Sequence, residues 1–327
     1  MQGESPGLKA PAASAPAGEA SGPGSAKTGA IRRVALGVSY LGCAYKGWQS
    51  QPDGGTVQDT LEAALTEFAT KPIKVLCAGR TDAGVHGINQ VVHLDTDMAR
   101  APFSWVRGTN TFLPKDIAVQ WAAEVPLRFH ARNSAIGRRY AYILLQAPVR
   151  PALESGRVGW VFRPLNLEAM QEAASHLIGE HDFSSFRSSM CQSPTPVKLL
   201  REIRITRSPL PSRPVQAASF DGATPDVYPE AGQGPMSALD GRGAYWRFDF
   251  EGQAFLHHMI RNIMGCLLAV GTGTRPASWV QEVLAARRRE VAAPTFAPDG
   301  LYFLGPAYDP AWGLPNVTPA LGWLPAG

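Results

Sequence analysis

The short stretch from Gly79 to Gly87 (GRTDAGVHG) places one arginine, one aspartate and one histidine among three glycines. Glycine permits sharp turns and lets another backbone approach closely. At such a turn, Asp82 could do no more than cap its own loop by accepting backbone N–H bonds. However, Arg80 lies two residues away, and a neighbouring cation keeps a carboxylate ionised even when it is partly buried. An ionised carboxylate can act as a nucleophile or a general base, so Asp82 is a candidate catalytic residue, with His86 nearby.

A second candidate lies in the stretch 138–142 (RRYAY). On a strand, Arg138, Tyr140 and Tyr142 share one face. A cation beside aromatic rings on a flat surface suits phosphate binding and base stacking. The alternative interpretation is an ordinary half-exposed strand.

The third candidate is the stretch HHMIRN, which begins at His257. The apolar spacing predicts a helix over 255–270, with His257, Arg261 and Gly265 in one row. Adjacent histidines point about 100° apart on a helix, and no carboxylate or cysteine stands at ligand spacing, so the pattern argues against a metal site. Arg261 on a largely apolar helix is different, because a buried arginine needs an anion.

The composition sets limits on the remaining possibilities. The chain has 327 residues, enough for two medium domains or one large one, and its net charge of +4 is only a weak indication of nucleic-acid binding. The sequence has no P-loop, dinucleotide fingerprint or G-x-S-x-G elbow. No apolar run approaches the ~20 residues of a membrane span, and the four cysteines are far apart, which fits a reducing cytoplasm.

Strands and helices alternate irregularly along the chain, with hairpins and few β-α-β units, which favours an α+β architecture of two similar-sized domains. We expect domains over 31–135 and 136–309, a disordered tail over 1–30 and a C-terminal tail over 310–327. Residues 208–242 hold six prolines and little apolar material, which indicates an inserted loop within a hairpin. Strands are expected over 32–40, 73–78, 90–94, 118–123, 138–145, 199–206 and 245–250. Helices are expected after the caps Thr56 and Asn166, and over 105–110, 255–270 and 279–289.

Several stretches occur together in one order, among them GVSYLGCAYKGWQSQ, VLCAGRTDAGVHGINQVVHL, FHARNSAIGRRYAYIL and FLHHMIRNIMG. With these stretches the chain closely resembles the tRNA pseudouridine synthase A family over residues 31–207 and 243–309. The resemblance implies a pseudouridine synthase fold, with two similar α/β-sandwich-like domains, a mostly antiparallel sheet and a central basic cleft. It also implies a cofactor-free isomerase that acts as a homodimer on uridine in the anticodon arm of tRNA, around positions 38 to 40.

By position, Asp82 matches the nucleophile of that family, Arg80 and Arg261 match its basic partners, and Tyr140 matches the tyrosine that packs on the target base. We expect further contacts to substrate from residues beside these motifs: Arg138, Arg139, His86 and His257. The long N-terminal tail and the Pro-rich insert depart from the family pattern, but neither touches the motifs.

The implied reaction agrees with a single carboxylate. Pseudouridine formation breaks the C1′–N1 glycosidic bond and makes a C1′–C5 bond, through positive charge on the sugar. Asp82 could attack C1′, or it could take a proton from C2′ to give a glycal. Two other classes of function stay open: a non-catalytic tRNA-binding or tRNA-folding protein, and a hydrolase of N-glycosides. The hydrolase needs a group that activates water near Asp82, for which His86 is the candidate.

Overall fold

The computed structural model describes residues 30–209 and 243–315. All but the last residue of the N-terminal tail expected over 1–30, nearly all of the Pro-rich insert and the last twelve residues lie outside the described residues. None of the described helices is long and apolar enough to cross a membrane.

The described strands form a single sheet of ten strands, with the order β4-β1-β3-β10-β5-β9-β8-β7 and with β2 on β3 and β6 on β5. The pairings are antiparallel except for β10 with β3 and β5 with β6. This confirms the expected α+β class with a mostly antiparallel sheet. The strands are β1 (Arg32–Tyr40), β2 (Leu76–Cys77), β3 (His86–Thr96), β4 (Ile117–Val125), β5 (Ala135–Gln146), β6 (Gly159–Val161), β7 (Gly179–Asp182), β8 (Val197–Pro209), β9 (Ala244–Gly252) and β10 (Leu301–Tyr308).

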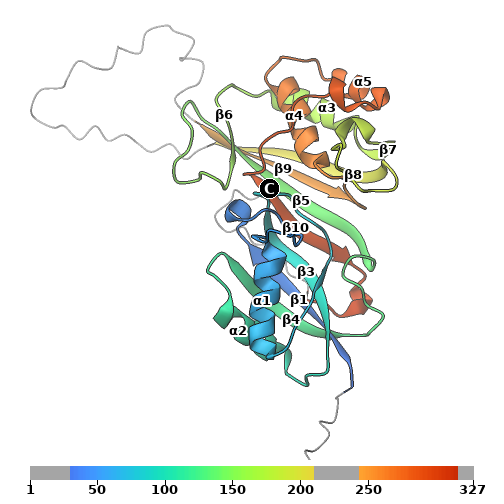
Figure 1. Cartoon of the computed structure of the whole chain (residues 1–327). Coiled ribbons are helices and arrows are strands. Elements are labelled where there is room, and N and C mark those ends of the chain that lie inside the picture. Colours follow the sequence, from blue (N-terminus) through green and yellow to red (C-terminus); the bar gives the residue numbers. More distant parts are fainter. Residues whose placement is uncertain (1–29, 210–242, 316–327) are drawn as a thin grey trace, which may run out of the picture.

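The helices gather in two groups at opposite ends of the molecule, α1 and α2 beside β1, β3 and β4, and α3, α4 and α5 beside β7 and β8 (Figure 1). The two predicted caps are confirmed, because the side chains of Thr56 and Asn166 each accept a backbone N–H three residues on. The helices are α1 (Val57–Ala69), α2 (Pro102–Phe112), α3 (Leu167–Ser175), α4 (Met259–Gly271) and α5 (Trp279–Ala286).

Strand β10 joins the two groups. It pairs with β3 on one side and with β5 on the other, although it follows both in the chain by more than a hundred residues. The boundary expected between residues 135 and 136 therefore falls at the start of a strand that lies inside the shared sheet. The core follows the alternation of β5: Tyr140, Tyr142 and Leu144 pack into the core under α3–α5, whereas Ala141 and Ile143 face a second cluster.

The predicted strand over 73–78 and the predicted helix over 279–289 are both shorter in the structure. Over 73–78, only Leu76 and Cys77 pair as a strand, because Ile73 and Val75 donate their N–H groups to side chains of α1 instead, namely to Thr66 and Glu62. The helix predicted over 279–289 ends at Ala286, where the next residue has a left-handed backbone.

The first residues of the expected C-terminal tail are ordered against the sheet. Residues 310–312 form a short 3₁₀ helix, and Trp312 packs on Phe129, with Arg128 over its ring at 5.6 Å.

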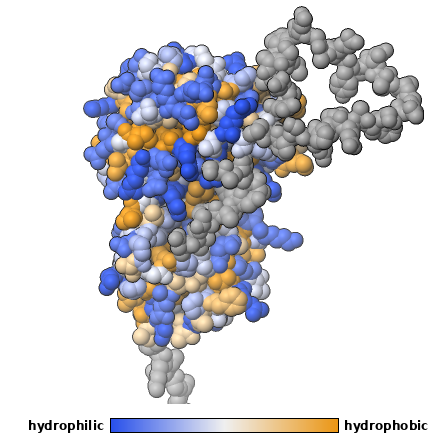
Figure 2. Space-filling view, turned by 180° about the vertical axis from the view of Figure 1, so that it is seen from behind, coloured by the Kyte–Doolittle hydropathy of each residue, from blue (hydrophilic) through white to orange (hydrophobic). Residues whose placement is uncertain are grey.

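Hydrophilic side chains cover most of the face shown in Figure 2, and hydrophobic ones gather in a patch in its upper half.

Candidate active site

Asp82 lies on a short turn between β2 and β3. The N–H of Val85 donates to the Asp82 carbonyl at 3.1 Å, and Gly84 has a φ of 81°, which glycine adopts without strain. Thr81, the residue before Asp82, is also held by a hydrogen bond, since its carbonyl accepts the N–H of Trp48 at 3.0 Å. The glycines of this stretch therefore do what the sequence predicts: they allow a tight turn.

The turn is anchored in the other half of the molecule. Val85 is 2% exposed and belongs to the core cluster formed under α3–α5, together with Tyr140 and Phe303. Because Val85 is three residues from Asp82, this packing places the carboxylate against the C-terminal half.

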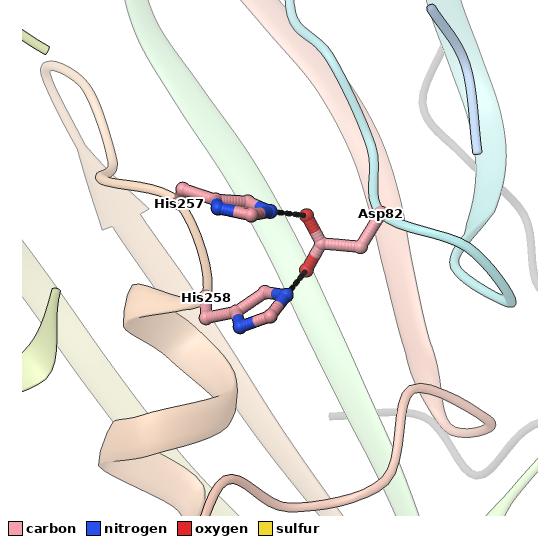
Figure 3. A group of neighbouring side chains, drawn as sticks. All are labelled: Asp82, His257 and His258. Carbon is pink, nitrogen blue, oxygen red and sulfur yellow. Dashed lines mark ion pairs between the residues drawn. The ribbon is translucent and has the colours of Figure 1, made fainter. Parts of the chain in front are cut away.

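Three side chains from the start of α4 converge on the Asp82 carboxylate. Nε2 of His257 lies 3.3 Å from Oδ1, while Nε2 of His258 and Nη1 of Arg261 lie 3.6 Å and 3.3 Å from Oδ2. Figure 3 shows both imidazole rings directed at the same carboxylate. The Asp82 side chain is only 19% exposed.

The electrostatic balance at Asp82 favours the ionised form. Burial by itself would raise the pKa of Asp82, but the bond with His257 and the charges of His258, His257 and Arg261 outweigh it, so the pKa lies below its usual value. The carboxylate is therefore an acceptor, as a nucleophile or base requires.

The sequence predicted both histidines within the helix, but they precede it. Helix α4 begins at Met259, and His258 is its N-cap with a left-handed backbone, φ 63°. This conformation brings the two ring centroids to 4.0 Å, whereas adjacent residues within a helix would point about 100° apart. The sequence pattern indicated no metal site, but Asp82, His257 and His258 each offer one ligand atom within 4.8 Å of the others.

Arg261 is a largely buried arginine, 14% exposed, and it pairs with an anion as the sequence predicts. Its Nε donates to the Phe296 carbonyl at 2.8 Å, and its own carbonyl accepts the N–H of Phe296 at 3.1 Å. A Cβ at Gly265 would lie 2.2 Å from the Pro294 carbonyl oxygen, so only glycine allows this segment to pack so closely on α4. The segment fixes the guanidinium and leaves Nη1 directed at Asp82.

Tyr140 lies next to the carboxylate at the edge of the core. The residue is 9% exposed, and its ring contacts Phe255 and Phe303, with centroids 5.1 Å and 4.9 Å away. Burial, and then the charge of Asp82, raise the pKa of the Tyr140 phenol well above its usual value, so the hydroxyl stays protonated. The half-exposed strand of the alternative interpretation is excluded at this position.

The other predicted arginines do not contact the carboxylate. Arg80 is exposed and donates to Gln192 at 3.4 Å, and among the described residues it is not an ion-pair partner of Asp82. Arg138 donates to the carbonyls of Gln253, Arg132 and Ala78, which gives its guanidinium a structural role. Arg139 has a buried Nε with no hydrogen-bond partner in the part of the chain that the structure describes.

His86 is part of the core and not of the site. It is 1% exposed; its Nδ1 accepts the N–H of Gly42, and its Nε2 lies 3.0 Å from the Asp299 carbonyl, which accepts the remaining proton. Burial lowers the pKa of His86, so the ring is neutral. Neither nitrogen is free to contact substrate or to activate water, which corrects both roles considered for His86.

A cavity of about 440 Å³ adjoins the site through His258. Its walls carry hydroxyl and guanidinium groups, which can bind a phosphate, together with one carboxylate, that of Glu290. It is lined by Ser184, Arg187, Ser188, Ser189, His258, Arg289, Glu290 and Thr295. Sequence reasoning missed both this cavity and the role of His258, because the lining comes from three separate segments; the double histidine was the one visible signal.

Comparison with known proteins identifies the family of the chain. The family model described as tRNA pseudouridine synthase matches residues 37–133 and 173–309. The chain belongs to this family. A tRNA pseudouridine synthase A of Paracidovorax citrulli (strain AAC00-1) is 64% identical over 290 residues, which are 89% of this chain and 99% of that protein. One of Delftia acidovorans (strain DSM 14801 / SPH-1) is 61% identical, again over 89% of this chain and 99% of the relative.

Proposed function

We propose that this chain isomerises uridine to pseudouridine in the anticodon arm of tRNA, around positions 38 to 40, with Asp82 as the catalytic carboxylate. The observation that carries the proposal is the paired, partly buried and ionised carboxylate of Asp82, which Arg261 contacts at 3.3 Å from the other half of the molecule. Membership of the tRNA pseudouridine synthase family supports it.

The reaction needs one charged acceptor beside the sugar. Asp82 either bonds to C1′ as N1 leaves, or takes the C2′ proton and later returns it; both routes use its ionised form. The base must then turn and rejoin the sugar through C5. Water is not consumed, so a second catalytic carboxylate is unnecessary.

Tyr140 has the position and chemistry to hold the detached base. Its ring packs against Phe255 and Phe303, the residue is 9% exposed, and its hydroxyl feels the charge of Asp82. A flat, fixed aromatic surface lets a base rotate in its plane while it remains stacked. The protonated hydroxyl can donate a hydrogen bond, but it is a poor base.

Access for a paired nucleotide requires that the base leave the helix, at a cost of a few kcal/mol. Contacts to phosphates offset this cost. Arg80 is exposed on the catalytic loop, which makes it an RNA contact instead of the counter-ion inferred from the sequence. The cavity beside His258, with Arg187 and Arg289 in its wall, suits a phosphate that flanks the flipped nucleotide.

The two alternatives have less support. A non-catalytic tRNA binder would have no use for a carboxylate kept ionised in a partly buried position. A hydrolase of N-glycosides would need to activate water, and His86, the candidate for that role, has both nitrogens bonded to backbone.

We also infer a homodimer in the cytoplasm, on the strength of the family resemblance alone. Light scattering of the purified chain tests the dimer directly. A monomer at micromolar concentration would contradict it.

The activity is tested with tRNA transcripts that carry uridine at a single position of the anticodon arm: 38, 39 or 40. We expect carbodiimide-dependent primer stops at these positions with no change of mass. A matched transcript with cytidine at all three positions is the control. Stops elsewhere in the tRNA would overturn the assignment to the anticodon arm, and loss of the base would indicate the hydrolase.

A further inference from the structure

We propose that Asp82, His257 and His258 form a binding site for a divalent transition ion such as Zn²⁺, and that the bound ion inhibits the enzyme by occupying the catalytic carboxylate. The binding site follows from geometry alone, whereas the inhibition rests on the proposed function. The two parts can fail independently in the experiment described below.

The spacing of the ligand atoms fits a tetrahedral ion. Bonds of about 2.0–2.2 Å to tetrahedral zinc hold any two ligand atoms roughly 3.4 Å apart. Nε2 of His257 and Oδ1 of Asp82 are 3.3 Å apart, Nε2 of His258 and Oδ2 are 3.6 Å apart, and one ligand atom of each residue lies within 4.8 Å of the other two. Small rotations of the side chains would bring all three onto one ion, with a fourth position open to water.

The backbone directs the two rings toward the carboxylate in advance. His258 has a left-handed backbone conformation, with φ 63°, that residues other than glycine seldom adopt. The next turn is fixed, since the His258 carbonyl accepts the N–H of Asn262 at 2.9 Å. Both imidazoles consequently point at Asp82 (Figure 3). The side chains of His257 and His258 are 38% and 29% exposed, so an ion can reach them from solvent.

The charge of Arg261 limits the affinity. Its Nη1 lies 3.3 Å from Oδ2 of Asp82 and would repel a dication. We therefore expect binding in the micromolar range, far weaker than at structural zinc sites. Imidazole ligands favour Zn²⁺, Cu²⁺ and Ni²⁺, whereas Mg²⁺ prefers oxygen ligands, so the magnesium that accompanies tRNA should not compete.

The binding test uses the metal-stripped full chain and Co²⁺, which absorbs visible light strongly when four-coordinate. We expect saturable uptake of one ion in the wild type, displaced by Zn²⁺ and unaffected by millimolar Mg²⁺. His257→Gln and His258→Gln should each weaken binding at least tenfold. His176→Gln is the matched control, because His176 caps α3 away from the site. Arg261→Gln should tighten binding at least tenfold, a gain that damage to the fold would not give.

The inhibition test adds Zn²⁺ to the pseudouridine assay, with recovery by a chelator. No saturable cobalt spectrum in the wild type, or equal affinity in His257→Gln and His258→Gln, would overturn the site. Binding without inhibition of an active enzyme would overturn the inhibitory role. If the wild type binds Co²⁺ but makes no pseudouridine, the site stands and the proposed function fails.

Discussion

Replacing Arg261 with leucine is expected to lower both stability and catalysis. The variant removes the guanidinium that lies 3.3 Å from Asp82 and leaves that carboxylate with two histidines; the two paired side chains are 14% and 19% exposed. Opposite unit charges about 4 Å apart attract by roughly 4 kcal/mol at an effective dielectric constant of 20. The variant also no longer has the cost of burying the guanidinium, and this gain offsets about half of the lost attraction. We expect the free energy of unfolding to fall by about 2 kcal/mol, below the 3–5 kcal/mol for breaking a fully buried pair.

In thermal unfolding this loss corresponds to a melting temperature about 4–8 °C lower. The pKa of Asp82 should rise, because one of the groups that lower it is gone. Loss of a charged group next to the reacting centre typically reduces the chemical rate by about a hundredfold or more, which single-turnover assays measure. tRNA affinity should change by less than roughly tenfold, because phosphate contacts elsewhere remain.

Arg80→Leu is the matched control, because Arg80 is exposed and makes one long bond; its stability should stay within about 0.5 kcal/mol of the parent. Adding Asp82→Asn to Arg261→Leu should give a coupling energy of at least about 1 kcal/mol. A melting temperature of Arg261→Leu within about 1 °C of wild type, or strictly additive effects in the cycle, would refute the pairing.

Three further results are expected. Tyr140→Phe should keep tRNA affinity and retain activity unless its hydroxyl transfers a proton, whereas Tyr140→Leu should lose activity more severely in single-turnover assays; equal activity of Leu and Tyr would contradict the stacking role. Replacing residues 210–242 with a four-residue turn should leave melting temperature and activity near wild type, because Pro209 and Ala244 already pair across the hairpin and loop closure costs little; a large loss of either would reveal a docked role. Burial lowers the pKa of His93 to about 4, below the usual 6.5, so the neutral ring stabilises the fold above pH 6.5 and this contribution is lost between pH 6.5 and 4. The free energy of unfolding of His93→Gln, measured in urea, should therefore depend less on pH in this range. An unchanged pH profile would contradict the role given to His93.

Local signals predicted local structure well. Thr56 and Asn166 cap their helices as expected, since a side-chain cap depends on residues three positions apart. The pairing of Arg261 with an anion followed from its place on an apolar helix, and the family resemblance implied Asp82 as the partner.

Local sequence patterns did not predict contacts between segments that are far apart in the chain. The guanidinium of Arg138 donates hydrogen bonds to carbonyls of three segments, and no sequence pattern around Arg138 predicts these acceptors. His86 looked available for substrate beside Asp82, yet it lies next to β10 in the sheet with its ring 4.5 Å from that of Tyr302, and β10 starts more than two hundred residues later. The helical period extended smoothly through His257 and His258, but the left-handed turn at His258 depends on contacts that periodicity does not report.

The most direct measurement is single-turnover pseudouridine formation by pure Asp82→Asn protein. Asparagine nearly matches the shape of aspartate, so the loop should fold, but its amide is useless against C1′ and too weak a base for C2′. Removing one negative charge leaves the phosphate contacts in place, so tRNA affinity should stay within roughly tenfold of wild type, about 1.4 kcal/mol, while no pseudouridine forms. Substantial pseudouridine, with mass spectrometry excluding deamidation back to aspartate, would contradict the assignment of Asp82 as the catalytic carboxylate.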